Sequence, residues 1–211
     1  MVSLKNMKII DGLKIKSDKL PIEIPDVGRE DLPKFFKDLG FKVGAEIGVD
    51  RGHFSESLCK SGLRVYAIDP WLDYGDYRNR RKKQKEMDSW YESTKEKLAP
   101  YDCEIIRKFS LDAVKDFEDG SLDFVYIDGA HDFQNVTNDI VEWSKKVRKG
   151  GVISGHDYII IDRINDIIHV KQVVDAYTRA YKIDPWFILG RKDQREGEIR
   201  DKQRSWFWIK Q

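Results

Sequence analysis

The sequence predicts an α/β protein: a Rossmann-like, mostly parallel sheet of seven strands with a C-terminal antiparallel hairpin and helices on both faces. Three observations support this fold class. Short apolar runs alternate with helical patterns between residues 43 and 181, as in β-α-β units. The first apolar run opens into a turn that contains Gly48 and Gly52. Near the C-terminus, two apolar segments follow one another without a helix between them, so they must pair antiparallel.

The composition sets limits on the class of protein. The chain has 211 residues, which is most simply one domain with a sizeable core. With 40% hydrophobic and 36% charged residues it is globular, and its net charge of +1 argues against a general attraction to nucleic acid or anionic membranes. No stretch is apolar for long enough to be a signal peptide or a membrane span. The cysteines, Cys59 and Cys103, fit no zinc or CxxC pattern, so we expect a cytoplasmic protein with reduced thiols.

The elements follow from periodicity and turn signals. Residues 1–28 are expected to form a short β-like or irregular arm, because KLPIEIP alternates in polarity but is broken by prolines. Gly40 and Gly62 are the stop signals of the first two helices. The expected helices span 29–39, 54–60, 135–146 and 170–181, with a short one at 111–117. The expected strands lie at about 43–48, 64–69, 103–110, 122–127, 152–158, 185–190 and 205–210.

The turn after the first strand is the strongest candidate binding feature. Glu46, Gly48 and Gly52 lie in an E-x-G-x-x-x-G run, and glycine lets the backbone approach a ligand closely. Asp69 follows about 20 residues later at the end of the second strand, where an acid accepts hydrogen bonds from ribose hydroxyls in doubly wound folds. The spacing departs from the G-x-G-x-x-G dinucleotide fingerprint, which disfavours an NAD-dependent oxidoreductase.

Acids and histidines follow two later strands. FVYIDGAHD delivers Asp128, His131 and Asp132 at the end of one strand, and VISGHDY delivers His156 and Asp157 at the end of the next. Because the carboxyl ends of adjacent parallel strands meet at one edge of a sheet, these residues should lie beside the glycine turn. A histidine near neutral pKa can act there as a general base.

The series EIGVDRGHFS, AIDPW, SLDFVYIDGAHDF, KGGVISGHDY and SWFWIK resembles the class I S-adenosylmethionine-dependent methyltransferases. The similarity is to a branch of small stand-alone proteins related to metal-dependent sugar O-methyltransferases, and it runs from about Leu32 to the C-terminus. It implies S-adenosyl-L-methionine as cofactor and an enzyme that methylates a small-molecule or glycan hydroxyl. Alignment of an in-line methyl transfer is then the main catalytic task.

The resemblance implies roles for individual residues. Gly48 and Gly52 would admit the methionine end, Glu46 would hold its amino group, and Asp69 would bind the ribose. Ser110 and Asp112 would contact the adenine edge, although Ser110 is equally well explained as a helix cap. Asp128 would lie at the cofactor.

The resemblance also implies a metal site. Asp128 and Asp157 would be ligands, with His156 as a candidate third ligand. His131 would be the base, with His156 as a second candidate base. His156 stands where relatives carry a second carboxylate, and this weakens a magnesium site or favours a softer metal such as manganese, zinc or iron. Metal dependence is therefore left open.

Residues 71–101 are polar, charged and aromatic, and predict a helical, lid-like insertion over the acceptor. The side chains that could form an aromatic wall over the acceptor in this insertion are Asp73, Tyr74, Tyr77, Trp90 and Tyr91. The basic run at 78–85 is most simply a solvated helix face. The alternative function is a nucleic-acid-binding protein that uses this run, which the near-zero net charge disfavours. Homo-oligomerisation by pairing of the aromatic C-terminal strands between copies also stays open.

Overall fold

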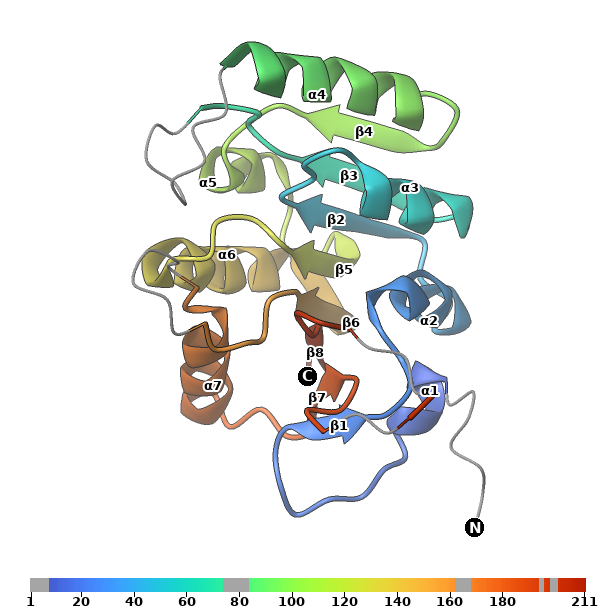
Figure 1. The fold of residues 1–211 in the computed structure, drawn as a ribbon, viewed down its shortest axis with the longest axis vertical. Helices are drawn as coiled ribbons and strands as arrows, with labels where there is room; N and C mark the ends of the chain where they lie inside the picture. The colour runs from blue at the N-terminus through green and yellow to red at the C-terminus, as the bar shows by residue number, and fades with distance from the viewer. Residues whose placement is uncertain (1–7, 74–83, 162–167, 194–195, 198–200) are drawn as a thin grey trace.

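A computed structural model describes residues 8–73, 84–161, 168–193, 196–197 and 201–211 (Figure 1). Its strands are β1 (Ile22–Ile24), β2 (Val43–Ile47), β3 (Arg64–Ile68), β4 (Cys103–Ile106), β5 (Leu122–Ile127), β6 (Val147–Gly155), β7 (Trp186–Leu189) and β8 (Trp206–Ile209). Its helices are α1 (Ile9–Gly12), η1 (Arg29–Asp31), α2 (Leu32–Asp38), α3 (His53–Lys60), α4 (Gln84–Leu98), α5 (Ser110–Ala113), η3 (Val114–Asp116), α6 (Phe133–Lys146) and α7 (Val170–Ala180).

In the described part of the chain, the strands form one sheet in the order β1-β7-β8-β6-β5-β2-β3-β4 (Figure 1). All neighbouring pairs are parallel except those of β8, which runs antiparallel to both β6 and β7. The predicted α/β class and terminal hairpin are confirmed. The strand count is corrected from seven to eight, because the N-terminal arm supplies β1, with Ile22 and Ile24 buried and Glu23 exposed.

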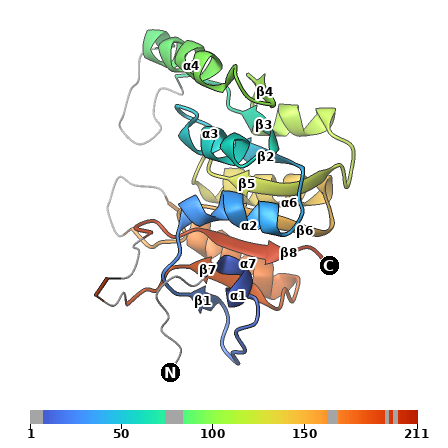
Figure 2. The same cartoon turned by 90° about the vertical axis from the view of Figure 1, so that its right-hand side faces the viewer.

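Helices cover both faces of the sheet (Figure 2). On one face, Phe36 of α2 stacks on Phe124 of β5 with 4.3 Å between ring centroids. On the other face, Trp143 of α6 and Val174 of α7 pack with Ile153 of β6. The strands are short apolar runs because both of their faces are buried, as parallel sheets require.

Helix α4 connects β3 to β4 and falls within the predicted insertion at 71–101. Leu98 at its C-terminal end is buried and packs with Trp71, Ala67 and Val49. Tyr74 and Tyr77 of the proposed aromatic wall, and the basic run except its last two positions, lie outside the described residues. The lid therefore stays a prediction.

The hairpin of β7 and β8 lies inside the sheet. Strand β8 has β6 and β7 as neighbours, and β7 has β8 and β1. Both strands thus have their backbone hydrogen-bonding edges filled, which leaves no edge for strand pairing between two copies of the chain, and homo-oligomerisation stays a prediction. Cys59 is buried and Cys103 half-buried, both as free thiols. Among the described helices, none combines the length and the apolarity that crossing a bilayer would require.

Candidate active site

The strand register brings the predicted motifs to one edge of the sheet. Ile47 of β2 is level with Ile68 of β3 and with Ile127 of β5, and Ile127 is level with Gly155 of β6. The residue after each of these strands is a predicted site residue. The four residues that share this edge are Gly48, Asp69, Asp128 and His156.

The glycine turn packs closely against neighbouring parts of the protein. Gly48 has φ +88° and Gly52 has φ +71°, in the left-handed region that side chains disfavour. A Cβ on Gly48 would lie 2.3 Å from the carbonyl oxygen of Asp128, and one on Gly52 would lie 2.8 Å from Cγ2 of Thr94. Glycine is therefore needed here to let β5 and α4 approach the turn.

Asp69 holds this turn in place. Its carboxylate accepts hydrogen bonds from the backbone N–H groups of Val49 (3.0 Å), Asp50 (3.1 Å) and Trp71 (2.8 Å). Burial raises the pKa of Asp69, and these backbone donors oppose the shift without cancelling it. Trp71, fully buried, donates from Nε1 to the carbonyl of Asp50 at 2.8 Å. Sequence reasoning did not assign Trp71 this supporting role.

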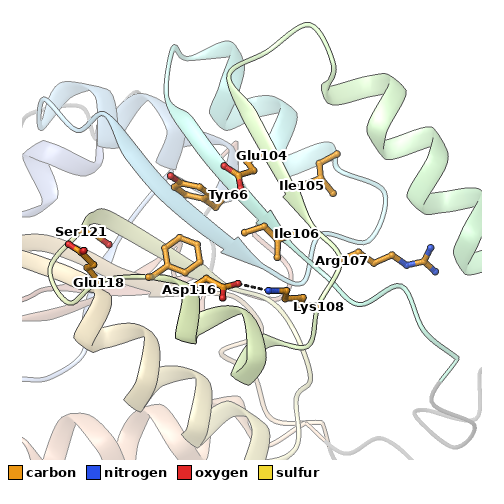
Figure 3. Close-up of a pocket in the computed structure, with 10 residues that line it drawn as sticks. Tyr66, Glu104, Ile105, Ile106, Arg107, Lys108, Asp116, Glu118 and Ser121 are labelled. Atoms are coloured by element: carbon orange, nitrogen blue, oxygen red, sulfur yellow. Dashed lines mark hydrogen bonds and ion pairs between the residues drawn. The ribbon is translucent and has the colours of Figure 1, made fainter.

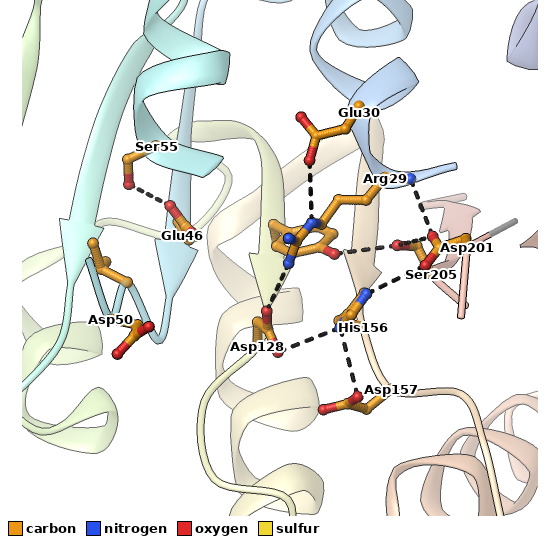
Figure 4. A network of polar contacts seen from close by, with 12 residues as sticks. Arg29, Glu30, Glu46, Asp50, Ser55, Asp128, His156, Asp157, Asp201 and Ser205 are labelled. Atoms are coloured by element: carbon orange, nitrogen blue, oxygen red, sulfur yellow. Dashed lines mark hydrogen bonds and ion pairs between the residues drawn. The ribbon is translucent and has the colours of Figure 1, made fainter. Parts of the chain in front are cut away.

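Glu46 is buried at 2% exposure, and its carboxyl group accepts a hydrogen bond from the hydroxyl of Ser55 in α3 (Figure 4). Burial raises the pKa of Glu46 well above its usual range. The Glu46–Ser55 contact ties the end of β2 to the helix that follows the glycine turn. Glu46 thus lies beneath the turn, in the protein interior.

The two residues predicted at the adenine edge differ in their surroundings. Ser110, at the start of α5, contacts the carboxylate of Asp139 and accepts a hydrogen bond from Nε1 of Trp143 at 2.8 Å. Burial raises the pKa of Asp139 to about 6. Asp112 is exposed and pairs with Lys115 at 2.8 Å. Sequence reasoning missed Asp139, whose position on α6 carried no motif.

An acid–histidine cluster lies at the carboxyl ends of β5 and β6. His131 Nε2 contacts Oδ2 of Asp157 and lies 3.6 Å from Oδ1 of Asp128. Asp157 has φ +57°, a conformation that places its carboxylate at the cost of backbone strain. Ligand atoms of Asp128, His131 and Asp157 all lie within 4.8 Å of one another. Neighbouring Asp132 serves another purpose, since its carboxylate caps α6 by accepting from Gln134 and Asn135.

His156 also lies beside Asp128 and is buried (Figure 4). Its Nδ1 lies 3.8 Å from Oδ1 of Asp128 and 3.6 Å from Oδ1 of Asp157, while Nε2 lies 3.5 Å from Oδ1 of Asp201. Burial lowers the pKa of His156, but Asp201 and the two other carboxylates raise it by more, so the net shift is upward.

Two further residues join the cluster and were missed from the sequence. Arg29, at the start of η1, donates from Nη1 to Oδ2 of Asp128 at 3.3 Å, and its backbone N–H donates to Asp201 at 3.1 Å. Asp201 precedes β8 in the charged connection between β7 and β8. Neither residue stands in a motif, because each is brought to the site by long-range packing rather than by local sequence.

A separate cavity of about 580 Å³ runs along β3 and β4 (Figure 3). Its wall includes Tyr66, Phe117 and the Lys108–Asp116 ion pair, at 2.6 Å. None of the predicted site residues lines it, so we assign it no part in the site.

The fold and this edge define a nucleotide-cofactor-binding α/β protein. A family model described as a methyltransferase domain matches residues 45–158, more than half of the chain. The chain therefore belongs to this family of methyltransferase domains, which confirms the resemblance seen in its motifs. No curated protein sequence matches it.

Solved structures with low sequence identity share the fold. One is an O-methyltransferase from Bacillus cereus in complex with S-adenosylhomocysteine, with a TM-score of 0.58 and 18% identity over 86% of this chain and 80% of that one. Another is the O-methyltransferase TomG from Streptomyces achromogenes in complex with S-adenosylmethionine, with a TM-score of 0.57 and 14% identity over 87% of this chain and 79% of that one. At these identities the similarity is one of fold.

Proposed function

We propose that this methyltransferase-family protein transfers a methyl group from S-adenosylmethionine to a hydroxyl of a small molecule or glycan. The register of the strands is the observation that most directly supports this proposal. It aligns a glycine turn, a turn-holding acid and an acid–histidine cluster at one edge of the sheet. The solved structures that share the fold and bind this cofactor or its product add support.

The chemistry asks two things of the protein. The sulfonium of S-adenosylmethionine already activates the methyl group, so the site must align the acceptor oxygen for in-line attack. A hydroxyl acceptor must also lose its proton. His131 is the base that we favour, because Asp157 contacts its Nε2 and stabilises the imidazolium that forms. His156 is held between Asp201 and two other carboxylates, which suits a supporting role.

The same cluster fits a divalent metal. Asp128, His131 and Asp157 offer two carboxylates and one imidazole, donors that suit manganese or iron better than magnesium. These three residues would hold the ion, with His131 in the position predicted for His156. His131 would then act as a ligand, so its role as the base applies to the site without a metal. A bound ion would lower the pKa of an acceptor hydroxyl.

For the remaining cofactor contacts, we keep the predicted roles as proposals. The carboxylate oxygens of Asp69 already accept hydrogen bonds from backbone N–H groups. Asp69 would therefore bind a ribose hydroxyl only through the remaining lone pairs of these oxygens. Ser110 is held by Asp139 and Trp143, so an adenine contact would use its remaining acceptor capacity. Asp112 is the weakest candidate, because it is exposed and paired with Lys115.

Two further proposals concern the acceptor and the location. The acceptor is a small molecule, with a glycan as the finer alternative, and the protein is cytoplasmic. Nothing in the comparisons supports the nucleic-acid alternative. Its basic run, residues 78–85, lies mostly outside the described residues. A filter-binding assay at low salt tests it, because a phosphate-binding patch would retain RNA or DNA and lose it steeply with added salt.

Calorimetry with S-adenosylhomocysteine tests the cofactor directly. We expect binding at sub-millimolar concentration to the folded protein, and Asp69→Asn should weaken it because the glycine turn loses part of its support. Asp119→Asn is the matched comparison and should change affinity by less than about twofold, since its side chain is exposed and pairs with Lys146 at the amino end of β5. A folded wild-type protein with no detectable binding would overturn the cofactor proposal.

A further inference from the structure

The two carboxylate oxygens of Asp128 face different partners. Oδ1 lies 3.6 Å from Nε2 of His131 and 3.8 Å from Nδ1 of His156. Oδ2 instead accepts from Nη1 of Arg29 at 3.3 Å (Figure 4). Asp128 therefore separates a histidine side of the site from a side that carries a cationic residue of the N-terminal segment.

The Arg29 side is the side of the glycine turn. The guanidinium carbon lies 5.4 Å from the ring centroid of Phe54, which belongs to the first turn of α3 directly after Gly52. The positive end of the α3 dipole adds to the potential there. The Arg29 side chain is 32% exposed, so solvent reaches it.

Arg29 has capacity for another anion. Nη1 contacts Asp128, and Nε lies 3.6 Å from a carboxylate oxygen of Glu30, whose side chain is 71% exposed. Within the described residues, no recorded hydrogen bond or ion pair uses Nη2. A planar guanidinium presents five N–H donors and binds carboxylates with two parallel hydrogen bonds.

We propose that Arg29 binds the amino-acid carboxylate of S-adenosylmethionine and so fixes the methionine end of the cofactor between the glycine turn and Asp128. The inference rests on the proposed function. The cofactor carries one carboxylate, and Arg29 stands over Phe54 on the glycine-turn side, away from the His131–Asp157 pair where the acceptor would be deprotonated. The ammonium group of the same amino acid would then lie toward Asp128.

The test compares two ligands across the wild-type protein and three variants. S-adenosylhomocysteine carries the carboxylate, whereas S-adenosyl-3-thiopropylamine keeps the amino group and lacks the carboxylate. Calorimetry measures the affinity of each for wild type, Arg29→Gln and Arg29→Lys. Arg64→Gln removes one positive charge at the amino end of β3, at the edge of the sheet opposite the site, and serves as control. Thermal unfolding of each variant reports its folding.

We expect Arg29→Gln to weaken S-adenosylhomocysteine binding about tenfold or more, as for a charge-assisted contact, and to change S-adenosyl-3-thiopropylamine binding less than about twofold. Arg29→Lys should lie between, and Arg64→Gln should leave both affinities as in wild type. An equal loss for both ligands would overturn the proposal in favour of a structural role. Unchanged affinities with a raised KM for the acceptor would assign Arg29 to an anionic acceptor instead. Both outcomes leave the cofactor proposal standing, because it depends on wild-type binding alone.

Discussion

Nε2 of His131 contacts Oδ2 of Asp157, so the loop after β5 and the end of β6 meet in a histidine–carboxylate pair. The two residues are 26 positions apart in the chain, yet parallel pairing of Ile127 with Gly155 makes them neighbours. Both side chains are nearly inaccessible, at 10% and 5% exposure. A low-dielectric setting strengthens such a pair and fixes the orientation of the imidazole.

His131→Ala should therefore affect chemistry more than cofactor binding. Loss of a positioned general base lowers turnover by about 100-fold or more. The dissociation constant of S-adenosylhomocysteine should change little, because the proposed cofactor contacts lie on the other side of Asp128. Steady-state kinetics and calorimetry on the same preparation check both quantities. Equal losses in turnover and in affinity would remove His131 as the base.

Removal of divalent metal should reveal whether the cluster uses an ion. We expect that a chelator lowers turnover and that Mn²⁺ restores it better than Mg²⁺, because one of the three donors is an imidazole. Asp157→Asn should weaken Mn²⁺ binding about tenfold or more, measured from the electron paramagnetic resonance signal of free Mn²⁺. Glu142→Gln, on the exposed surface of α6, is the control. If the chelator leaves turnover unchanged and the protein binds no Mn²⁺, a metal role is ruled out.

Asp139 should make stability depend on pH in the acidic range. Burial raises the pKa of Asp139 from 3.8 to about 6. Between these pH values the carboxyl group is protonated in the folded protein and ionised in the unfolded chain. Its contribution to the free energy of unfolding is complete below about pH 4 and is lost as pH rises through about 6, by about 3 kcal/mol at most. Asp139→Asn removes this titration. Chemical denaturation from pH 4 to 7.5 should show the variant gaining stability relative to wild type, and a constant difference would contradict the shift.

Gly52→Ala should destabilise the protein for two separable reasons. A side chain at φ +71° costs about 1–2 kcal/mol, and the new Cβ would also lie 2.8 Å from Cγ2 of Thr94. Thr94→Ser removes that methyl group and keeps the hydroxyl, which lies 3.5 Å from the carbonyl of Asp50. In urea unfolding, the double variant should be more stable than the sum of the single changes predicts. Strict additivity would show that the contact with Thr94 carries no energy.

The local patterns predicted most of the elements. The apolar runs at 43–48 and 122–127 are strands β2 and β5, and the periodic segment at 170–181 is helix α7. The pattern of residues 1–28 predicts only a β-like or irregular arm, since the three residues of β1 gain a strand conformation only by pairing with β7. The strand expected at 152–158 begins earlier, at Val147 of β6, and its register against β5 shifts between Leu122 and Phe124.

The sequence by itself determined the α/β class, the terminal hairpin and the strand ends that carry Gly48, Asp69, Asp128 and His156, because periodicity and turn chemistry are local properties. The tertiary structure decided what those residues touch. It turned Asp69 toward the backbone of the glycine turn and paired His131 with Asp157. It also brought Arg29 from the N-terminal segment to Asp128, 99 positions away. Such contacts depend on how distant elements pack, and no local pattern specifies that packing.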